Sequence, residues 1–291
     1  MPFLLRVYQG QLQIADNNFL LPNTAFTNTL TQKLSGTTIS AIRACYGFKL
    51  CFSTYVGPVV NIRRASDNAT SDFYADNTNN IGQSLYGTGT SLASWLASTT
   101  GYVTKWYDQT GNGYHVTQAT TGNQPQIILN DAGGICLYLL NVTNQLVMSS
   151  PNIWGGSTTS VSNAHIIWVM KEIGRQNTVG FSLANGSSFW LHSPWGDGTF
   201  YFDTGVRTQQ AGPASVGTKV YFSGYKDSTA NITGFKINGT AVETSNVAAT
   251  VDGTLIFNYG GYLCNLYAYS FVLLNKSLRN TAEETSLLNY F

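Results

Sequence analysis

GYVTKWYDQTGNGYHVTQATTGNQP, residues 101–125, contains a strand, a turn and the start of a second strand. Between residues 101 and 107, Val, Lys and Tyr at every second position alternate with Tyr, Thr and Trp, which is the period of a β-strand with two different faces. Residues 108–113, DQTGNG, are rich in residues that reverse the chain, because they bond their own backbone or adopt positive φ. A strand-like rhythm returns at residues 115–120. The stretch therefore predicts a β-protein.

The composition of the chain is also β-rich. Its 291 residues include 29 Gly, 13% are aromatic and only 10% are charged, which is well below the ~25% of an ordinary soluble domain. The net charge is +1 and Arg63-Arg64 is the one adjacent basic pair, so we expect no binding of nucleic acid, which usually requires a basic face. Few charges and many amide and hydroxyl groups favour a surface that faces other protein or sugar.

Signals for membranes, export and disulfides are weak. No apolar run reaches the roughly 18 residues of a membrane span, and the apolar cluster Pro2–Leu5 is shorter than the roughly 7–15 apolar residues of a signal peptide.

The cysteines show no metal-binding spacing. If residues 45–51 are extended, the Cα atoms of Cys45 and Cys51 lie roughly 20 Å apart, too far for a disulfide. We expect four buried thiols, a reducing compartment, no metal and no cofactor.

The chain divides at about residue 36. Residues 1–36 are rich in Asn and have apolar clusters without a sustained period, which predicts an arm that docks onto another surface. Residues 37–291 are predicted to form one sandwich domain, with short helices within residues 88–99 and 280–288. Its strand-like runs are residues 44–55, 59–64, 101–107, 115–120, 127–140, 164–171, 218–225, 233–243 and 255–274.

Three local patterns define this domain further. Ala164–Lys171 is almost continuously apolar, which predicts a strand buried on both faces. Asn238-Gly239 lies between two alternating runs and predicts a tight hairpin. Asn280 and Glu283 have the spacing of a helix N-cap with its capping-box partner. Together the patterns predict an all-β jelly-roll sandwich of two antiparallel sheets with a short C-terminal helix.

Four segments resemble the concanavalin A-like lectin/glucanase superfamily, and the resemblance covers about residues 37–291. Within it, residues 101–119 resemble the catalytic domain of fungal α-L-arabinofuranosidase B, and similar modules recur in structural and fibre proteins of phages and large DNA viruses. The segments are GPVVNIRRASDNATSDF at 57–73, GYVTKWYDQTGNGYHVTQA at 101–119, GFKINGTAVE at 234–243 and the closing GGYLCNLYAYSFVLLNKSLRNTAEETSLLNYF at 260–291.

The arabinofuranosidase resemblance implies a retaining glycosidase, which needs two carboxyl groups about 5–5.5 Å apart. The positions that match its nucleophile and its acid are Ser187 and Tyr262, so both carboxyl groups are expected to be absent. The chain has four glutamates. Of these, Glu172 has Lys171 and Arg175 nearby, which would favour its charged form over a proton-donating one. The sequence alone therefore predicts a protein that is not an enzyme.

One polar and aromatic region of the sequence is a candidate site, and three other polar features are expected to be structural. Aromatic rings stack on sugar faces and carboxylates bind hydroxyls, so the region of Trp190, His192, Trp195 and Asp197 is the candidate glycan site, with core packing as the alternative. His165 lies inside an apolar run and is expected to be a core histidine. The central turn, with Trp106, Asp108, Gly111 and Gly113, is interpreted as structural because it offers one carboxylate, too few for calcium. Asn238 and Gly239 are likewise structural.

The leading hypothesis from the sequence is a non-enzymatic virion structural protein, such as a minor capsid, capsid-decorating or fibre/attachment protein. It would be made in the host cytoplasm and located in the virion. Its expected partners are other capsid or fibre proteins, or a second copy bound through the arm. The alternatives are a carbohydrate-binding module that recognises host or virion glycans, and a glycosidase with displaced catalytic residues.

Overall fold

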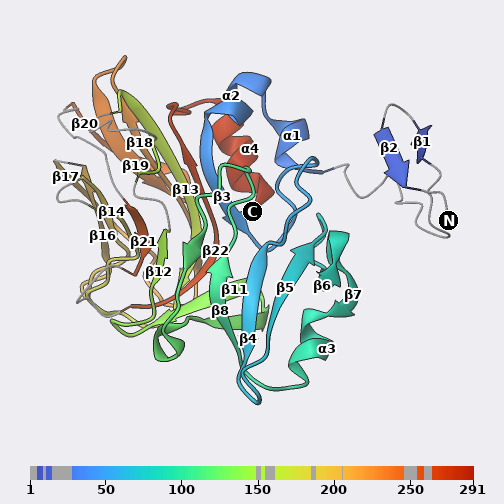
Figure 1. The fold of residues 1–291 in the computed structure, drawn as a ribbon. Coiled ribbons are helices and arrows are strands. Elements are labelled where there is room, and N and C mark those ends of the chain that lie inside the picture. The colour runs from blue at the N-terminus through green and yellow to red at the C-terminus, as the bar shows by residue number, and fades with distance from the viewer. Residues whose placement is uncertain are drawn as a thin grey trace.

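The computed structural model describes residues 5–8, 11–14, 28–148, 152–154, 161–184, 188–204, 206–245, 254–258 and 264–291. The paired strands of the domain are antiparallel and form two layers, which we call the back sheet and the front sheet (Figure 1). The back sheet contains, in spatial order, β10 (Gln126–Asp131), β11 (Gly134–Leu140), β22 (Asn265–Leu274), β13 (Asn163–Glu172), β18 (Lys219–Asp227), β19 (Ile232–Ile237) and β20 (Thr240–Thr244), with β3 (Ile42–Gly47) beside the other half of β22.

The front sheet is longer and begins with a small extension formed by β7 (Thr88–Ser91) and β6 (Ile81–Ser84). The two layers are joined where β10 pairs with β8 at Gln126 and Tyr102. The rest of the front sheet is, in spatial order, β5 (Thr70–Ala75), β4 (Val60–Arg64), β8 (Gly101–Trp106), β9 (Val116–Thr117), β12 (Leu146–Met148), β21 (Thr254–Phe257), β14 (Phe181–Ala184), β15 (Ser188–His192), β16 (Thr199–Thr204) and β17 (Arg207–Ala211).

The core between the layers is aromatic. Phe257, Phe181, Leu191 and Phe202 lie opposite one another on successive strands of the front sheet, and all four are fully buried. Because directly opposed residues on antiparallel strands point to the same face, this register lines the interior with one continuous apolar row. Burial of each large side chain stabilises the fold by about 1.5–3 kcal/mol. The front sheet is thereby fixed with its alternate residues facing outward.

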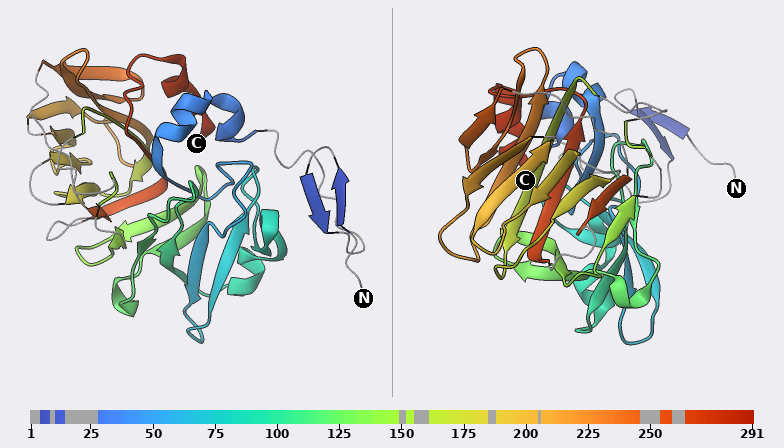
Figure 2. Two further views of the ribbon diagram at one scale, coloured as in Figure 1. Left: turned by 45° about the horizontal axis from the view of Figure 1, so that its top comes forward. Right: turned by 90° about the vertical axis from the view of Figure 1, so that its left-hand side faces the viewer.

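Helices cover the outer side of the back sheet. α4 (Ala282–Tyr290) packs through Leu287 and Tyr290 against Ile167 and Val272 of that sheet. α1 (Leu30–Lys33) and α2 (Gly36–Ala41) lie beside it, whereas α3 (Leu92–Leu96) lies next to the front-sheet extension (Figures 1 and 2). Among the described residues, no helix is long and apolar enough to cross a membrane.

The predicted all-β sandwich is confirmed, and so are most of its local signals. The opening strand of the central stretch is β8, although only Val116–Thr117 of the second run is a strand. Asn238 (φ 49°) and Gly239 (φ 87°) form the tight turn between β19 and β20. The predicted helix at 88–99 is confirmed as α3, but residues 88–91 before it form β7.

The prediction for Cys45 and Cys51 was wrong in its premise. β3 ends at Gly47, and the chain then turns instead of continuing as a strand. As a result Cys51 returns close to Cys45: burial raises the pKa of the Cys45 thiol, and the neighbouring Cys51 thiol raises it further. All four cysteines are nevertheless buried and free.

The start of α4 also differs from the prediction. Thr281, not Asn280, is the N-cap, and its hydroxyl oxygen accepts a hydrogen bond from the Glu284 backbone at 3.2 Å. Asn280 has φ 58°, a conformation that Asn tolerates but that cannot begin a helix. Glu283 bonds a different part of the chain, because its carboxylate accepts from the Ser35 backbone at 2.7 Å.

Within residues 1–36, β1 (Leu5–Tyr8) and β2 (Gln11–Ile14) pair as a hairpin. Leu30 and Leu34 are buried in the same cluster as Leu287 and Tyr290 of α4. The Leu30 backbone N–H donates to the Cys51 carbonyl at 2.8 Å. Residues from 28 onward are thus packed against the sandwich, while self-association through the arm stays a prediction.

Candidate functional site

A row of residues in cross-strand register crosses the outer face of the front sheet. Because directly opposed residues point to the same side, this row lies on the face opposite to the apolar core. Its middle is aliphatic, and its polar and aromatic members gather towards the two ends. From β4 to β17 the row is Asn61, Lys105, Thr117, Val147, Ile256, Ser182, Trp190, Asp203 and Arg207.

Around the β15–β16 end of this row lie five residues, Trp190, His192, Trp195, Tyr201 and Asp203, which we call the Asp203 cluster. His192 is at its centre, with Nε2 3.2 Å from Asp203 Oδ2. The His192 ring lies 4.9 Å from the Trp195 ring, edge to face, and 6.3 Å from the Tyr201 ring, between centroids. His192 is only 5% exposed, whereas Trp190 and Trp195 are partly exposed. The cluster therefore presents aromatic rings beside a buried imidazole.

Asp203 is held in its ionised form. Arg207 donates two hydrogen bonds to it, from Nε to Oδ1 and from Nη2 to Oδ2, each 2.7 Å long. Burial alone would raise the pKa of Asp203, but the hydrogen bonds from Arg207 and His192 outweigh it and lower the pKa to about 2. This carboxylate is therefore negative throughout the neutral and mildly acidic range.

A second carboxylate, Asp197, lies in the turn between β15 and β16. Its Oδ1 accepts from the Thr199 backbone at 2.8 Å and its Oδ2 accepts from the Tyr201 hydroxyl at 2.9 Å. These bonds lower the pKa of Asp197, the one from the Thr199 backbone most. Tyr201 thus connects the turn to the Asp203 cluster, because it bonds Asp197 and precedes Asp203 by two positions on the same strand face.

The glycan site predicted from the sequence overlaps this region. The structure brings together all four predicted glycan residues, Trp190, His192, Trp195 and Asp197. Sequence reasoning missed Tyr201, Asp203 and Arg207. The available signal was the alternation in TFYFDT, residues 199–204, which places Tyr201 and Asp203 on the face opposite to Phe200 and Phe202. What the sequence could not supply was the pairing of β15 with β16.

The central turn has the geometry of a structural element. The Asp108 carboxylate is buried and accepts hydrogen bonds from the Cys45 backbone at 3.0 Å, from the Thr110 hydroxyl at 2.7 Å and from the Tyr114 backbone at 3.3 Å. Gly111 and Gly113 have φ of 85° and 78°, which only glycine adopts easily. Trp106 is buried and stacks on Phe48, with 5.2 Å between ring centroids. These groups contact the protein itself and leave Asp108 no free oxygen for a substrate.

Glu172 departs from its sequence-based prediction. Arg175 Nε lies 3.6 Å from its Oε1, but Lys171 bonds Asp131 instead. Burial raises the pKa of Glu172 and outweighs the opposing effect of Arg175. The expected preference for the charged form is therefore wrong. Glu172 follows Met170 on the interior side of β13, so it does not face the Asp203 cluster.

The two positions that the resemblance assigned to catalysis, Ser187 and Tyr262, lie outside the described residues. In the parts of the chain that the structure does describe, no group of three or more His, Cys, Asp or Glu residues has a metal-binding arrangement. The groups present in the Asp203 cluster and the neighbouring turn are carboxylates, an imidazole and aromatic rings.

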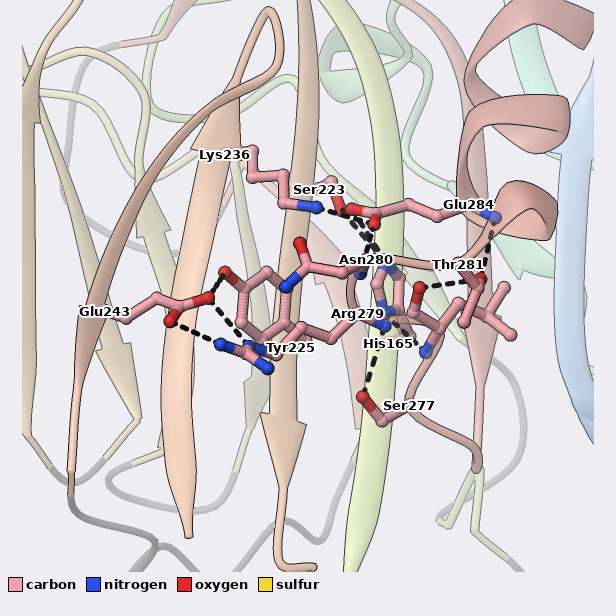
Figure 3. A network of polar contacts seen from close by, with 11 residues as sticks. His165, Ser223, Tyr225, Lys236, Glu243, Ser277, Arg279, Asn280, Thr281 and Glu284 are labelled. Atoms are coloured by element: carbon pink, nitrogen blue, oxygen red, sulfur yellow. Dashed lines mark hydrogen bonds and ion pairs between the residues drawn. The ribbon is translucent and has the colours of Figure 1, made fainter. Parts of the chain in front are cut away.

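A second histidine network lies under α4 and has the composition of a Ser-His-Glu triad (Figure 3). His165 Nε2 lies 2.9 Å from Ser223 Oγ, and Ser223 Oγ lies 2.6 Å from Glu284 Oε1. In a triad the imidazole accepts the proton of the serine. Here the Leu278 backbone N–H donates to His165 Nδ1 at 3.1 Å, so the proton of the neutral ring is on Nε2 and the serine donates to the glutamate.

This arrangement cannot activate Ser223 as a nucleophile. His165 and Ser223 are fully buried, so no substrate reaches them. Burial also lowers the pKa of His165 to about 4, which keeps the ring neutral. Glu284 additionally binds Lys236 Nζ at 2.6 Å and the Asn280 backbone at 2.9 Å. The network connects α4 to the back sheet through hydrogen bonds and an ion pair, and it is not a catalytic site.

Comparisons with known proteins find similarity to arabinofuranosidases. A family model described as the catalytic domain of α-L-arabinofuranosidase B matches residues 35–135. An arabinofuranosidase complexed with arabinofuranosyl-α-1,2-xylobiose has a similar fold, with a TM-score of 0.59 and 15% identity over 86% of this chain and 62% of that one. A variant of a GH54 α-L-arabinofuranosidase soaked with 4-nitrophenyl α-L-arabinofuranoside has a TM-score of 0.60 and 15% identity over 86% of this chain and 63% of that one. A comparison with curated proteins gave no match.

These findings correct the functional hypothesis drawn from the sequence. The prediction of a non-enzymatic virion structural protein is contradicted, because the matching family model is that of a catalytic domain and nothing in the comparisons supports a viral role. The expectation that the protein is not an enzyme rests on Ser187 and Tyr262, which lie outside the described residues. At 15% identity the two solved structures establish the fold alone, and this chain spans less than two thirds of their length.

Proposed function

We propose that this chain is a glycoside hydrolase domain of the arabinofuranosidase type, and that its sugar substrate binds the outer face of the front sheet at the Asp203 cluster. The observation that carries the proposal is the match of residues 35–135 to the arabinofuranosidase B catalytic domain. The shared sandwich fold is consistent with it, and the Asp203 cluster supplies the groups that sugar recognition requires.

The cluster has two kinds of sugar-binding group. Trp190 and Trp195 are partly exposed, and aromatic rings of this kind can pack against the C–H side of a sugar ring. Asp203 accepts hydrogen bonds and stays ionised, so it can bind hydroxyl groups directly. Sites that orient a small ligand usually combine aromatic side chains with a small number of polar groups.

Asp203 is also suited to the charge that develops during glycoside cleavage. The transition state resembles an oxocarbenium ion, so a fixed negative charge beside it lowers the barrier. Arg207 and His192 position the carboxylate from two sides. We assign to Asp203 the role of the ionised carboxylate, and we assign no proton donor, because the pKa of Asp197 is lowered and Glu172 faces the interior.

The test is hydrolysis of two arabinofuranosides by the purified chain. Nitrophenolate leaves without protonation, so 4-nitrophenyl α-L-arabinofuranoside tests the ionised carboxylate alone, whereas arabinofuranosyl-α-1,2-xylobiose also requires a proton donor. Wild-type protein is expected to cleave the nitrophenyl substrate faster. Asp203→Asn should lower kcat/KM by about 100-fold or more.

The matched control is Asp67→Asn. Asp67 forms a similar ion pair with Arg64, at 2.7 Å, on another part of the surface, so its loss should leave hydrolysis unchanged. Equal activity of Asp203→Asn and wild type would refute the assignment of the site. Absence of hydrolysis of both substrates by the wild-type chain would refute the proposed function.

A further inference from the structure

The opposite end of the outer row contains a pocket that the proposed reaction does not use. This pocket, of about 480 Å³, opens beside β4, β8 and β9 and is lined in part by Arg63, Lys105, Tyr107, Thr104 and Thr117. Lys105 and Thr117 are adjacent members of the row that leads to Asp203. The pocket, which we call the Lys105 pocket, therefore lies on the same sheet face as the Asp203 cluster.

Two cations line the Lys105 pocket, and neither is in an ion pair with a described carboxylate. Arg63 bonds only neutral acceptors, with Nε 2.6 Å from Gln124 Oε1 and Nη1 2.9 Å from Asn68 Oδ1. Lys105 Nζ lies 5.1 Å from the centroid of the Tyr107 ring. These two cations outnumber the neighbouring Asp72 carboxylate of β5, so this end of the face has a net positive charge, whereas at the other end Asp203 and Asp197 outnumber Arg207.

The neighbouring polar groups are already held in place. Arg63 also lies over the Tyr102 ring, 4.7 Å from its centroid. Beside the pocket, Asp72 of β5 lies opposite Asn61 on the same face, and its carboxylate accepts from the Tyr107 hydroxyl at 2.8 Å and from Asn61 Nδ2 at 2.7 Å. These contacts fix the Arg63 guanidinium and the Tyr107 ring, so an incoming anion needs to order only the Lys105 side chain.

From these observations we infer that the Lys105 pocket is a subsite for the carboxylate of a uronic acid unit in the same glycan that the Asp203 cluster binds. This inference rests on the proposed function and specifies its substrate as an acidic oligosaccharide. Six strand spacings of about 4.8 Å, roughly 29 Å along the sheet, separate Lys105 from Asp203. A ligand that reaches both is therefore an oligosaccharide and not a single sugar. A uronate carboxylate matches the two cations, and Tyr107 offers a ring face to its sugar.

The experiment compares three ligands by isothermal titration calorimetry. They are an arabinoxylan oligosaccharide that carries a uronic acid unit, the same oligosaccharide with its carboxyl group reduced, and free glucuronate. The acidic oligosaccharide should bind about tenfold more tightly than its reduced form at low salt. The preference should shrink as the salt concentration rises, because exposed charges are screened.

Lys105→Gln should remove most of this preference and leave binding of the reduced oligosaccharide unchanged. Lys33→Gln, at an exposed position of α1, is the control and should change neither affinity. Equal binding of the two oligosaccharides by wild type would overturn the inference and leave the proposed function in place. Binding of free glucuronate as tight as that of the oligosaccharide would also overturn it, since the pocket would then be a site for a free anion. Failure of every ligand to bind would count against the proposed function itself.

Discussion

The networks around His165 and His192 contain the same kinds of group in different surroundings. Each histidine lies near a carboxylate, Glu284 or Asp203, and each carboxylate binds a cation, Lys236 at 2.6 Å or Arg207 at 2.7 Å. The Glu284 side chain is 3% exposed and that of Asp203 is 21% exposed. One network is sealed beneath α4, and the other opens onto the outer face of the front sheet.

The two networks show that the residue types in a cluster do not by themselves identify a catalytic site. Under α4 the acceptor nitrogen of His165 is bound to a backbone amide, and the serine hydroxyl points at a carboxylate. Every strong donor and acceptor there has a protein partner, so the network contributes rigidity. On the outer face, aromatic rings and an ionised carboxylate remain partly accessible to a ligand. Substitutions in the first network should therefore affect stability, and those in the second should affect activity.

The largest effect on stability is expected from Glu284→Ala. This change leaves Lys236, whose side chain is 12% exposed, without its anionic partner. It also removes the acceptor for Ser223 and for the Asn280 backbone. Breaking one side of a buried ion pair costs about 3–5 kcal/mol, so the free energy of unfolding measured by urea titration should fall by that amount.

Glu283→Ala is the control for that experiment. Glu283 is the preceding residue of the same helix, and its partner Lys276 is 38% exposed at 3.7 Å. The loss should be less than about 2 kcal/mol. If Glu284→Ala lowered the free energy of unfolding no more than Glu283→Ala does, the network under α4 would not stabilise the packing of this helix on the back sheet.

The stability of the fold is also expected to depend on pH, because His165 has different pKa values in the folded and unfolded chain. Burial lowers the pKa of His165 from 6.5 to about 4 in the folded state. Between these values the unfolded chain binds a proton that the folded chain does not, so stability decreases as the pH falls from 6.5 to about 4, by roughly 3 kcal/mol. Glu284, whose pKa is lowered on folding, adds a further loss as the pH falls below 4.5.

The measurement is a series of urea unfolding curves between pH 7 and pH 4 for wild type and His165→Gln. Gln keeps one donor and one acceptor but does not titrate in this range. The variant should show a flatter dependence above pH 4.5, whatever its stability at pH 7. Parallel curves for the two proteins would mean that His165 does not titrate differently in the two states.

The sequence predicted the sandwich better than it predicted the site. Alternation and turn residues act locally, so β8, β13 and the turn at Asn238-Gly239 were predictable. The outer-face row depends on which strands pair, and a pairing between β12 and β21, more than a hundred residues apart, leaves no local pattern. Burial is equally non-local, which is why the raised pKa of Glu172 contradicted the prediction made from its charged neighbours.

The smallest effect on stability is expected from Arg207→Gln. The Arg207 side chain is 57% exposed, and an exposed ion pair contributes less than about 1 kcal/mol to folding. Its effect on Asp203 should be larger, because Gln cannot replace both hydrogen bonds or the positive charge with which Arg207 lowers the pKa of this carboxyl. In the proposed hydrolase, the acidic limb of the kcat/KM profile for 4-nitrophenyl α-L-arabinofuranoside should move to higher pH while the urea midpoint stays nearly constant. A stability loss above about 2 kcal/mol with an unchanged pH profile would instead make Arg207 a structural residue, and the outer face would then resemble the sealed network under α4.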